Sequence, residues 1–249
     1  MRIFVCSTDE LQDAASFDAA SLIVDPARKK KLLKIHSPAD ARRSMGAGLL
    51  LAYAFEGYQK GTGDFFARAP GAGRIEEIPV SELLAVPKQF FLYREAAGGK
   101  PYLEGESGFH FSLSHSGAYA LCACASFEIG ADLQITDRQA GDNLAGKIMT
   151  QKEFDFYKEL SCEEKKQEFY RVFSCKESCC KLTGKGLSQG FRNMETDPER
   201  KRILMNETSP IENAVHWPAI VMCESFIWKE NYRIAVSYPV VDGKERIFE

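Results

Sequence analysis

Two short segments of this chain place a carboxylate beside basic and hydroxyl side chains. The first has the sequence IGADLQ and contains Asp132; the second has the sequence FSCKESCCK and contains Glu177 between Lys176 and Lys181. Two carboxylates brought together from distant segments, with lysines close by, would suit a hard divalent cation that holds phosphate oxygens. These residue types therefore indicate chemistry on a phosphate group.

The segment around Asp132 must be positioned by β structure. Residues 109–114 alternate at period two, residues 119–126 form a compact apolar strand, and a tight turn leads into residues 129–135. On that last strand Asp132 and Gln134 should share one face, because successive side chains point to opposite faces. A polar face on an otherwise buried hairpin is a poor feature of a core and favours a ligand site.

The segment around Glu177 must be positioned by a helix. Residues 151–160 and 163–182 have helical patterns, and in the second of them Glu177 and Lys181 lie one turn apart on the same face. Glycines follow as signals for the C-terminal end of that helix. Glu153 has no motif around it, and we expect it to be a solvated helix charge.

The N-terminal part carries its basic charge locally. Helices should begin at Pro26 and at Pro38, because each proline follows a capping residue and proline is favoured at the first helical position. Basic residues concentrate at positions 28–34 and at Arg42 and Arg43. Such a run is usually only the solvated face of a helix, so the charge alone assigns no ligand.

Three other segments have clear patterns. Residues 3–6 favour an opening strand, and residues 220–238 favour a closing β hairpin. Residues 61–73 are rich in glycine, and we expect a mobile loop there. Its Gly-x-Gly pairs lack the strand before and the Lys-Ser/Thr after that a phosphate-binding loop needs.

The composition is ordinary for a soluble globular protein. The chain of 249 residues, 45% hydrophobic and 27% charged, can form one large domain or two small ones. A net charge of −3 gives no global basicity for nucleic acid. No apolar run is long enough for a membrane span and the N-terminus does not read as a signal peptide, so we expect a cytoplasmic location. The eight cysteines lack metal-binding spacing and should be reduced core residues.

Four motifs in this order resemble those of the 4′-phosphopantetheinyl transferases, specifically the larger, monomeric type that primes carrier proteins of peptide and polyketide synthases. They are basic segments at 26–31 and 40–44, Gly-Lys-Pro at 99–101 with FSLSHS at 111–116, the Gly-x-Asp motif, and the Phe-x-x-Lys-Glu-Ser-x-x-Lys motif. The order and spacing agree over residues 25–190. One motif would be a weak signal, whereas four in the right order are a strong one.

The resemblance implies a fold and a division of the chain. The family has an α+β fold of two similar α/β halves related by a pseudo-twofold, with the active site at their interface. The N-terminal half, 1–110, would carry the basic segments that bind the phosphates of coenzyme A. The C-terminal half, 111–249, would carry the metal-binding and catalytic motifs.

The resemblance also assigns roles in the reaction. Asp132 would be the first magnesium ligand, Glu177 the second ligand and the general base, and Lys181 a contact of the diphosphate or of the departing phosphate. Without the family, Asp132 could be an ordinary carboxylate on a surface strand, and Glu177 an ordinary helix partner of Lys181.

Gln134 departs from the family pattern. The larger members usually have glutamate at this position as a third metal ligand. A glutamine offers a neutral carbonyl oxygen in its place and removes one negative charge. Two carboxylates and a substrate diphosphate still suffice for magnesium, which keeps several water ligands. The glutamine therefore affects how the magnesium ion would be coordinated more than the reaction that the ion supports.

Binding of coenzyme A is implied for seven positions. They are Arg28, Lys31, Arg43, Lys100, Ser114, His115 and Lys176. By resemblance, His115 contacts the 3′-phosphate end of coenzyme A; a structural histidine is the alternative. Ser114 and His115 do not suggest a serine hydrolase, because neighbours in a strand point to opposite faces and the chain lacks a Gly-x-Ser-x-Gly segment.

The implied activity is the magnesium-dependent transfer of 4′-phosphopantetheine from coenzyme A to a serine of an apo acyl or peptidyl carrier protein. Adenosine 3′,5′-bisphosphate would be released, and the enzyme would act as a monomer without nucleic acid or membrane. Two alternatives remain open. One is a non-catalytic relative that only binds coenzyme A or a carrier, and the other is a metal-dependent phosphohydrolase. The chain lacks the second cluster of Asp and His ligands that two-metal hydrolases need.

Overall fold

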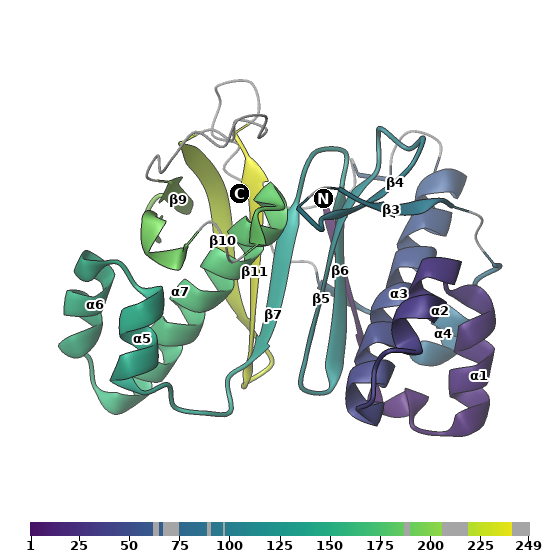
Figure 1. Ribbon diagram of the computed structural model, residues 1–249, viewed down its shortest axis with the longest axis horizontal. Helices are drawn as coiled ribbons and strands as arrows, with labels where there is room; N and C mark the ends of the chain where they lie inside the picture. Colours follow the sequence, from purple (N-terminus) through teal and green to yellow (C-terminus); the bar gives the residue numbers. More distant parts are fainter. Residues whose placement is uncertain are drawn as a thin grey trace. The chain divides into compact units, whose positions relative to one another are not determined.

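The structure, a computed structural model, describes residues 1–61, 65–66, 75–88, 91–96, 98–186, 190–205 and 219–240. They form two compact units (Figure 1). Among the described residues, unit 1 takes in those of 1–96 and 101–129, and unit 2 takes in those of 98–100 and 130–240. Each unit combines helices with an antiparallel or mixed sheet, so the predicted α+β class is confirmed.

The sheet of unit 1 has four strands in the order β2-β1-β6-β5. Strand β1 (Arg2–Ser7) pairs in parallel with β2 (Ile75–Glu77) and antiparallel with β6 (Tyr119–Ala125). Strand β6 also pairs antiparallel with β5 (His110–Ser116). The strands that we expected to open the C-terminal half therefore belong to unit 1, because both are hydrogen-bonded into the sheet that β1 begins.

Four α-helices accompany this sheet: α1 (Ala14–Ile23), α2 (Pro26–Leu32), α3 (Pro38–Lys60) and α4 (Val80–Leu84). A 3-10 turn, η1 (Asp9–Leu11), precedes them, and a two-stranded ribbon of β3 (Tyr93–Glu95) and β4 (Pro101–Leu103) follows them. The predicted starts at Pro26 and Pro38 are confirmed. The side chains of Asp25 and Ser37 cap α2 and α3 by accepting backbone N–H groups of the first turn.

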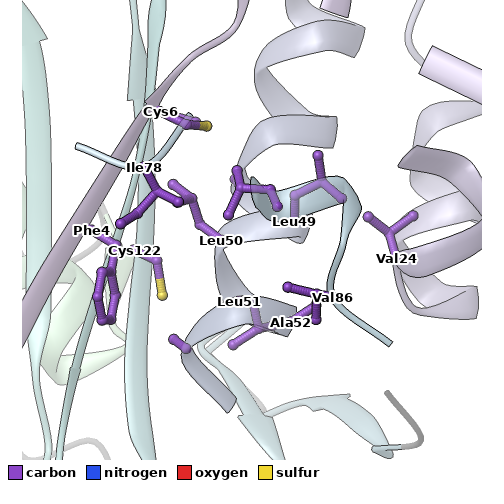
Figure 2. Packing of buried hydrophobic residues seen from close by; sticks show 14 of the residues in the cluster. Phe4, Cys6, Val24, Leu49, Leu50, Leu51, Ala52, Ile78, Val86 and Cys122 are labelled. Carbon is purple, nitrogen blue, oxygen red and sulfur yellow. The ribbon is translucent and has the colours of Figure 1, made fainter. Parts of the chain in front are cut away.

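The core of unit 1 forms where α3 packs on the sheet. Figure 2 shows Leu50 of α3 beside Ile78 and the sheet residues Phe4 and Cys122. All four of these side chains are buried. The helix thus covers one face of the sheet, and one of its N-terminal turns places Arg43 against the β5–β6 turn, where it donates to the carbonyl oxygen of Gly117.

The sheet of unit 2 has five strands in the order β7-β11-β10-β9-β8, all paired antiparallel. They are β7 (Gly130–Ile135), β8 (Met194–Asp197), β9 (Arg202–Met205), β10 (Ile220–Trp228) and β11 (Tyr232–Pro239). The predicted closing hairpin is confirmed as β10 and β11. The predicted hairpin before Asp132 is wrong, because β7 pairs with β11 and β6 pairs with β1 and β5. A turn after β6 is compatible with either partner, and only the long-range hydrogen bonds decide between them.

Three α-helices belong to unit 2: α5 (Asp142–Ile148), α6 (Gln151–Lys158) and α7 (Cys162–Thr183). A 3-10 turn, η3 (Phe191–Asn193), leads into β8. The helices predicted at 151–160 and 163–182 are confirmed. Gly184 ends α7 in the left-handed conformation, with φ of 69°. Helix α7 lies along β7 and β11 (Figure 1), so it covers the face of the sheet that carries Asp132.

Some expectations concern other parts of the chain. The glycine-rich loop predicted at 61–73 lies mostly outside the described residues. Among the described residues, all eight cysteines are free thiols, and seven of them are buried; Cys162 is exposed. No helix in the described ranges has the length and apolar character needed to cross a membrane.

Candidate functional site

Helix α7 approaches β7 so closely that the contact requires glycine at position 130. A Cβ atom on Gly130 would lie 2.0 Å from the carbonyl oxygen of Ser178 and 2.4 Å from the backbone nitrogen of Leu182. Real Cβ atoms do not come this close to backbone atoms. The glycine of the Gly-x-Asp motif therefore lets the helix lie directly on the strand, and this contact brings Asp132 beside the residues of α7.

Asp132 is almost fully buried and accepts hydrogen bonds from Lys181 and Gln134. Its side chain is 2% exposed. The ammonium of Lys181 donates to Oδ1 at 2.7 Å, and the amide nitrogen of Gln134 donates to Oδ2 at 2.8 Å. Asp132 and Gln134 thus lie on one face of β7, as the alternation predicts. Lys181 supplies the positive charge that the buried carboxylate needs.

Glu177 lies one turn before Lys181 on α7 and is half-buried. Burial raises the pKa of Glu177, and the negative charge of Asp132 raises that pKa further, while Lys181 acts in the opposite direction. The predicted helix face is therefore present, and the two carboxylates from β7 and α7 are close enough to repel each other. A raised pKa gives Glu177 a higher affinity for a proton, as a general base requires.

The same residues fit a magnesium ion. Asp132 and Glu177 supply carboxylate oxygens, and Gln134 supplies an amide group that could present its oxygen; these are the donors that magnesium prefers. The repulsion that raises the pKa of Glu177 is of the kind that a divalent cation relieves. Within the described ranges, no group of three or more His, Cys, Asp or Glu side chains is arranged for a metal. The donor set is thus two carboxylates and an amide, which suffices for an ion that keeps several waters.

Lys100 belongs to unit 2 through the end of α7. Its ammonium donates to the carbonyl oxygen of Leu182 at 2.8 Å. The backbone of the same segment is in close contact there, since a Cβ atom on Gly98 would lie 1.8 Å from the carbonyl oxygen of Gly184. A cation at the C-terminal end of a helix is favourable. The structure therefore places the ammonium of Lys100 at the C-terminal end of α7, on Leu182, the residue that follows Lys181.

Lys176 differs from the sequence expectation. Its side chain is 0% exposed, and its ammonium donates to Glu153 at 2.5 Å and to the carbonyl oxygen of Ile148 at 3.0 Å. The expectation that Lys176 binds coenzyme A is therefore not supported by its position, because both of these contacts lie within the protein interior. Glu153 is also not the solvated charge that we expected, since only 7% of it is exposed.

A local signal could have identified Glu153. It is the third residue of α6 and forms a capping box with Thr150, in which the side chain of each residue accepts from the backbone N–H of the other. The motif Thr-x-x-Glu before a helical pattern was readable in the sequence. The capping box directs the Glu153 carboxylate toward the start of α6, where the ammonium of Lys176 donates to it.

The basic residues predicted on α2 lie together in unit 1. Arg28 is 5% exposed, and its Nη1 lies 3.4 Å from the hydroxyl of Ser44. Its Nε and Nη2 atoms are buried without a hydrogen-bond partner among the described residues. Burial lowers the pKa of the neighbouring Lys31, and the charge of Arg28 lowers that pKa further. Buried donors without acceptors beside a second cation fit an anion such as a phosphate.

Arg43 and His115 form a second group in unit 1. Arg43 donates from Nη1 to the carbonyl oxygen of Gly117 at 3.0 Å, in the turn after β5, and pairs through Nη2 with Asp40. The hydrogen bond from Arg43 lowers the pKa of Asp40, and His115 contributes to the same shift. Ser114 is buried whereas His115 is exposed, as expected for neighbours on a strand. The two therefore do not act as a nucleophile and its base.

Comparison with known proteins gives a consistent result. Residues 128–237 match the family model of the 4′-phosphopantetheinyl transferase superfamily. A 4′-phosphopantetheinyl transferase psf-1 from Bacillus pumilus is 29% identical over 112 residues, which are 45% of this chain and 48% of the relative. A 4′-phosphopantetheinyl transferase from Bacillus subtilis is 25% identical over 188 residues, 76% of this chain and 72% of that protein. The match thus spans about half the length of the first relative. The matched residues include β7, α7 and most of β11, and β7 and α7 carry Asp132 and Glu177.

Proposed function

We propose that this chain transfers 4′-phosphopantetheine from coenzyme A to a serine of an apo carrier protein, because residues 128–237 match the 4′-phosphopantetheinyl transferase superfamily model and the two similar relatives are such transferases. Adenosine 3′,5′-bisphosphate is the second product, and the reaction requires magnesium. The observation that carries the proposal is the contact of Asp132 with Lys181 beside Glu177, at the point where α7 packs on β7.

Asp132 and Glu177, with Gln134, would hold the magnesium ion, which would offset the negative charge of the diphosphate during transfer. The remaining steps belong to the protein's own side chains. Glu177 accepts the proton of the carrier's serine hydroxyl, and its raised pKa suits this role. Lys181 faces the same carboxylate pair and stabilises the phosphate that leaves.

In the covalent step, the serine oxygen forms a bond to the β-phosphorus of coenzyme A, and the bond from that phosphorus to the bridging oxygen breaks. The electron pair of that bond leaves with adenosine 3′,5′-bisphosphate, and the serine proton resides on Glu177. The nucleophile comes from the carrier protein, so the chain needs no nucleophilic residue of its own.

We assign binding of the nucleotide's phosphates to Arg28, Lys31, Arg43 and His115 of unit 1, with Ser114 beside them. The support is the pair of buried guanidinium N–H groups of Arg28 that lack acceptors among the described residues. Phosphate oxygens would accept from those groups. Lys100, at the C-terminal end of α7, would contribute to the diphosphate. The monomeric state and the cytoplasmic location expected from the sequence stay predictions.

The test is direct transfer. The protein is incubated with coenzyme A, magnesium and apo carrier proteins of the fatty-acid, polyketide and peptide types, and the carriers are weighed by mass spectrometry. We expect one carrier or more to gain a phosphopantetheine group on its serine. Chelation of the magnesium, or the substitution Asp132→Ala, should prevent the gain.

Two outcomes would favour the alternatives. Binding of coenzyme A without mass gain on any carrier would support a non-catalytic relative. Cleavage of the diphosphate in the absence of a carrier would support a phosphohydrolase, with water in place of the serine hydroxyl.

A further inference from the structure

A buried ion pair outside the candidate site joins four elements of unit 2. Glu153 accepts from the ammonium of Lys176 and from the backbone nitrogen of Thr150 at Oε2, at 2.5 and 2.8 Å. At Oε1 it accepts from the backbone nitrogen and the hydroxyl of Thr196, both at 2.8 Å. Lys176 also donates to the carbonyl oxygen of Ile148. We call Glu153 and Lys176, with these bonds, the Glu153–Lys176 clamp.

The clamp connects the end of α5, the start of α6, strand β8 and helix α7. Its two side chains are 6% and 0% exposed, so water cannot replace the bonds that each charge receives. Rotation of α7 about its axis would pull the ammonium from the carboxylate and leave two buried charges without partners, which is strongly unfavourable. The clamp therefore resists rotation and sliding of α7.

Position along the helix links this restraint to the candidate site. Lys176 and Glu177 are consecutive, and successive residues of a helix differ by about 100° in direction. When Lys176 is held toward α5 and α6, Glu177 must lie on the side of the helix where Asp132 raises its pKa and Lys181 contacts Asp132. The rotation that the clamp opposes would move Glu177 out of this position.

We propose that Glu153 and Lys176 are positioning residues, which hold α7 in the rotation that places Glu177 beside Asp132, and that Lys176 does not bind coenzyme A. The effect on turnover rests on the proposed transferase function. The restraint on α7 does not depend on that function and can be tested separately.

The chain offers a matched control for the clamp. Lys152 of α6 and Glu195 of β8 form an ion pair at 2.6 Å that joins two of the same elements. Lys152 is 81% exposed, however, and exposed pairs contribute little to stability. Lys152→Met removes this bridge without leaving a buried charge, so we expect it to change neither the melting temperature nor turnover appreciably.

The main variant removes both charges of the clamp. Lys176→Met keeps an unbranched apolar stem, and Glu153→Gln keeps an oxygen that can accept from Thr196. Lys176→Met alone should lower the melting temperature most, because it leaves the Glu153 carboxylate buried and unpaired. In the double variant the melting temperature should recover in part. Its kcat should nevertheless fall roughly 10- to 100-fold, as expected for a misplaced catalytic group.

Measurement of the affinity for coenzyme A distinguishes a positioning role of Lys176 from direct contact with the substrate. We expect the dissociation constant of coenzyme A in the double variant to stay within about twofold of the wild-type value, since the lost interaction is not with substrate. Amide hydrogen exchange over residues 176–183 should accelerate in the double variant and not in Lys152→Met. Weaker binding of coenzyme A with unchanged kcat would show instead that Lys176 contacts the substrate.

If the double variant keeps the kcat of the wild type and its amide exchange rates over residues 176–183, the proposal is wrong. The ion pair would then only support the fold. If the wild-type protein modifies no carrier, the proposed function fails, and hydrogen exchange alone decides whether the clamp restrains α7. If the double variant does not fold, the wild-type protein provides the test. The N–H groups of Thr150 and Thr196 should then exchange only by global unfolding, and exchange through a local opening would contradict the clamp.

Discussion

At the residue scale, the candidate site depends on the charges around Asp132. This buried carboxylate receives one ammonium, from Lys181, and one neutral amide, from Gln134. Glu177 adds a second carboxylate whose pKa is raised by burial and by Asp132. Removal of either carboxylate should abolish magnesium-dependent turnover, so Asp132→Ala and Glu177→Gln are reference variants for the predictions below.

The first prediction concerns Gln134, where the chain departs from the motif of the family that it resembles. Gln134→Glu replaces the amide beside Asp132 with a carboxylate, and hard cations bind more tightly as ligand charge increases. The magnesium concentration for half-maximal activity should therefore fall. The increase in melting temperature on addition of magnesium should become larger than in the wild type, because the ion relieves a new repulsion.

Gln139→Glu is the matched control, since it adds the same charge at an exposed position after β7. It should leave both magnesium titrations unchanged. If Gln134→Glu leaves the magnesium titration unchanged while Asp132→Ala abolishes activity, Gln134 does not contact the metal.

The second prediction concerns the basic residues of unit 1. Arg28→Ala, Lys31→Ala and Arg43→Ala should each raise KM for coenzyme A, because they remove cations assigned to its 3′-phosphate. With dephospho-coenzyme A, which lacks that phosphate, the increase should be much smaller. Steady-state kinetics with both substrates measures the difference.

Lys30→Ala is the control for these variants, because Lys30 is an exposed cation on the same helix as Arg28. It should change neither KM. Equal losses with both substrates in Arg28→Ala would instead assign the buried guanidinium to the stability of the fold.

At the element scale, the site exists because α7 can lie directly on β7. The third prediction is that Gly130→Ala disrupts this contact, since the new Cβ would lie 2.0 Å from the carbonyl oxygen of Ser178. Ordinary overpacking costs about 1–3 kcal/mol, and a clash with backbone atoms should exceed that range. Gly146→Ala in α5 meets nothing closer than 3.7 Å and should be tolerated. Thermal unfolding of both variants provides the comparison, and equal melting temperatures would refute the close contact.

The fourth prediction concerns pH and the Glu153–Lys176 clamp. Burial by itself raises the pKa of Glu153, but Lys176 and the N–H groups of Thr196 and Thr150 outweigh it, so the pKa lies below its ordinary value of 4.5. A carboxyl group whose pKa is lowered by folding binds protons more readily in the unfolded state. Its contribution to stability is therefore complete above pH 4.5 and is lost as the pH falls through the lower pKa of the folded state.

The measurement is the free energy of unfolding in denaturant between neutral pH and pH 3. The wild-type protein should lose more stability over the acid part of this range than the variant with both Glu153→Gln and Lys176→Met. The other carboxyl groups titrate in both proteins and cancel in the difference. Parallel pH profiles would show that Glu153 has an ordinary pKa.

At the scale of the whole molecule, the proposed roles divide between the two units. The carboxylates and Gln134 belong to unit 2, within the segment 128–237 that matches the superfamily model, whereas Arg28, Lys31 and Arg43 belong to unit 1. In the proposed function, the carboxylates would serve the metal and the basic residues would serve the 3′-phosphate of coenzyme A. A variant in one unit should therefore leave unchanged the property that depends on the residues of the other unit.

The fifth prediction follows from this division. Gln134→Glu should shift the magnesium titration without altering the ratio of KM for dephospho-coenzyme A to KM for coenzyme A. Arg43→Ala should lower that ratio without shifting the magnesium titration. The combined variant should show both effects, because distant substitutions without shared partners are additive. A change of the KM ratio in Gln134→Glu would contradict the division.

The sequence by itself determined the features that depend on neighbours along the chain. Capping residues located the starts of α2 and α3, and helical periodicity placed Glu177 and Lys181 on one face of α7. Alternation in β7 placed Asp132 and Gln134 on one face. These features were predictable because backbone geometry relates residues that are two to four positions apart.

The tertiary structure decided which distant segments meet. It paired β7 with β11 rather than with β6, and it placed the α7 backbone against Gly130. It also joined Lys176 to Glu153, 23 positions away, so that a lysine next to Glu177 became a buried structural partner. Neither periodicity nor motif spacing contains this information, because a long-range contact depends on how helices and strands pack and on which buried charges can be satisfied together.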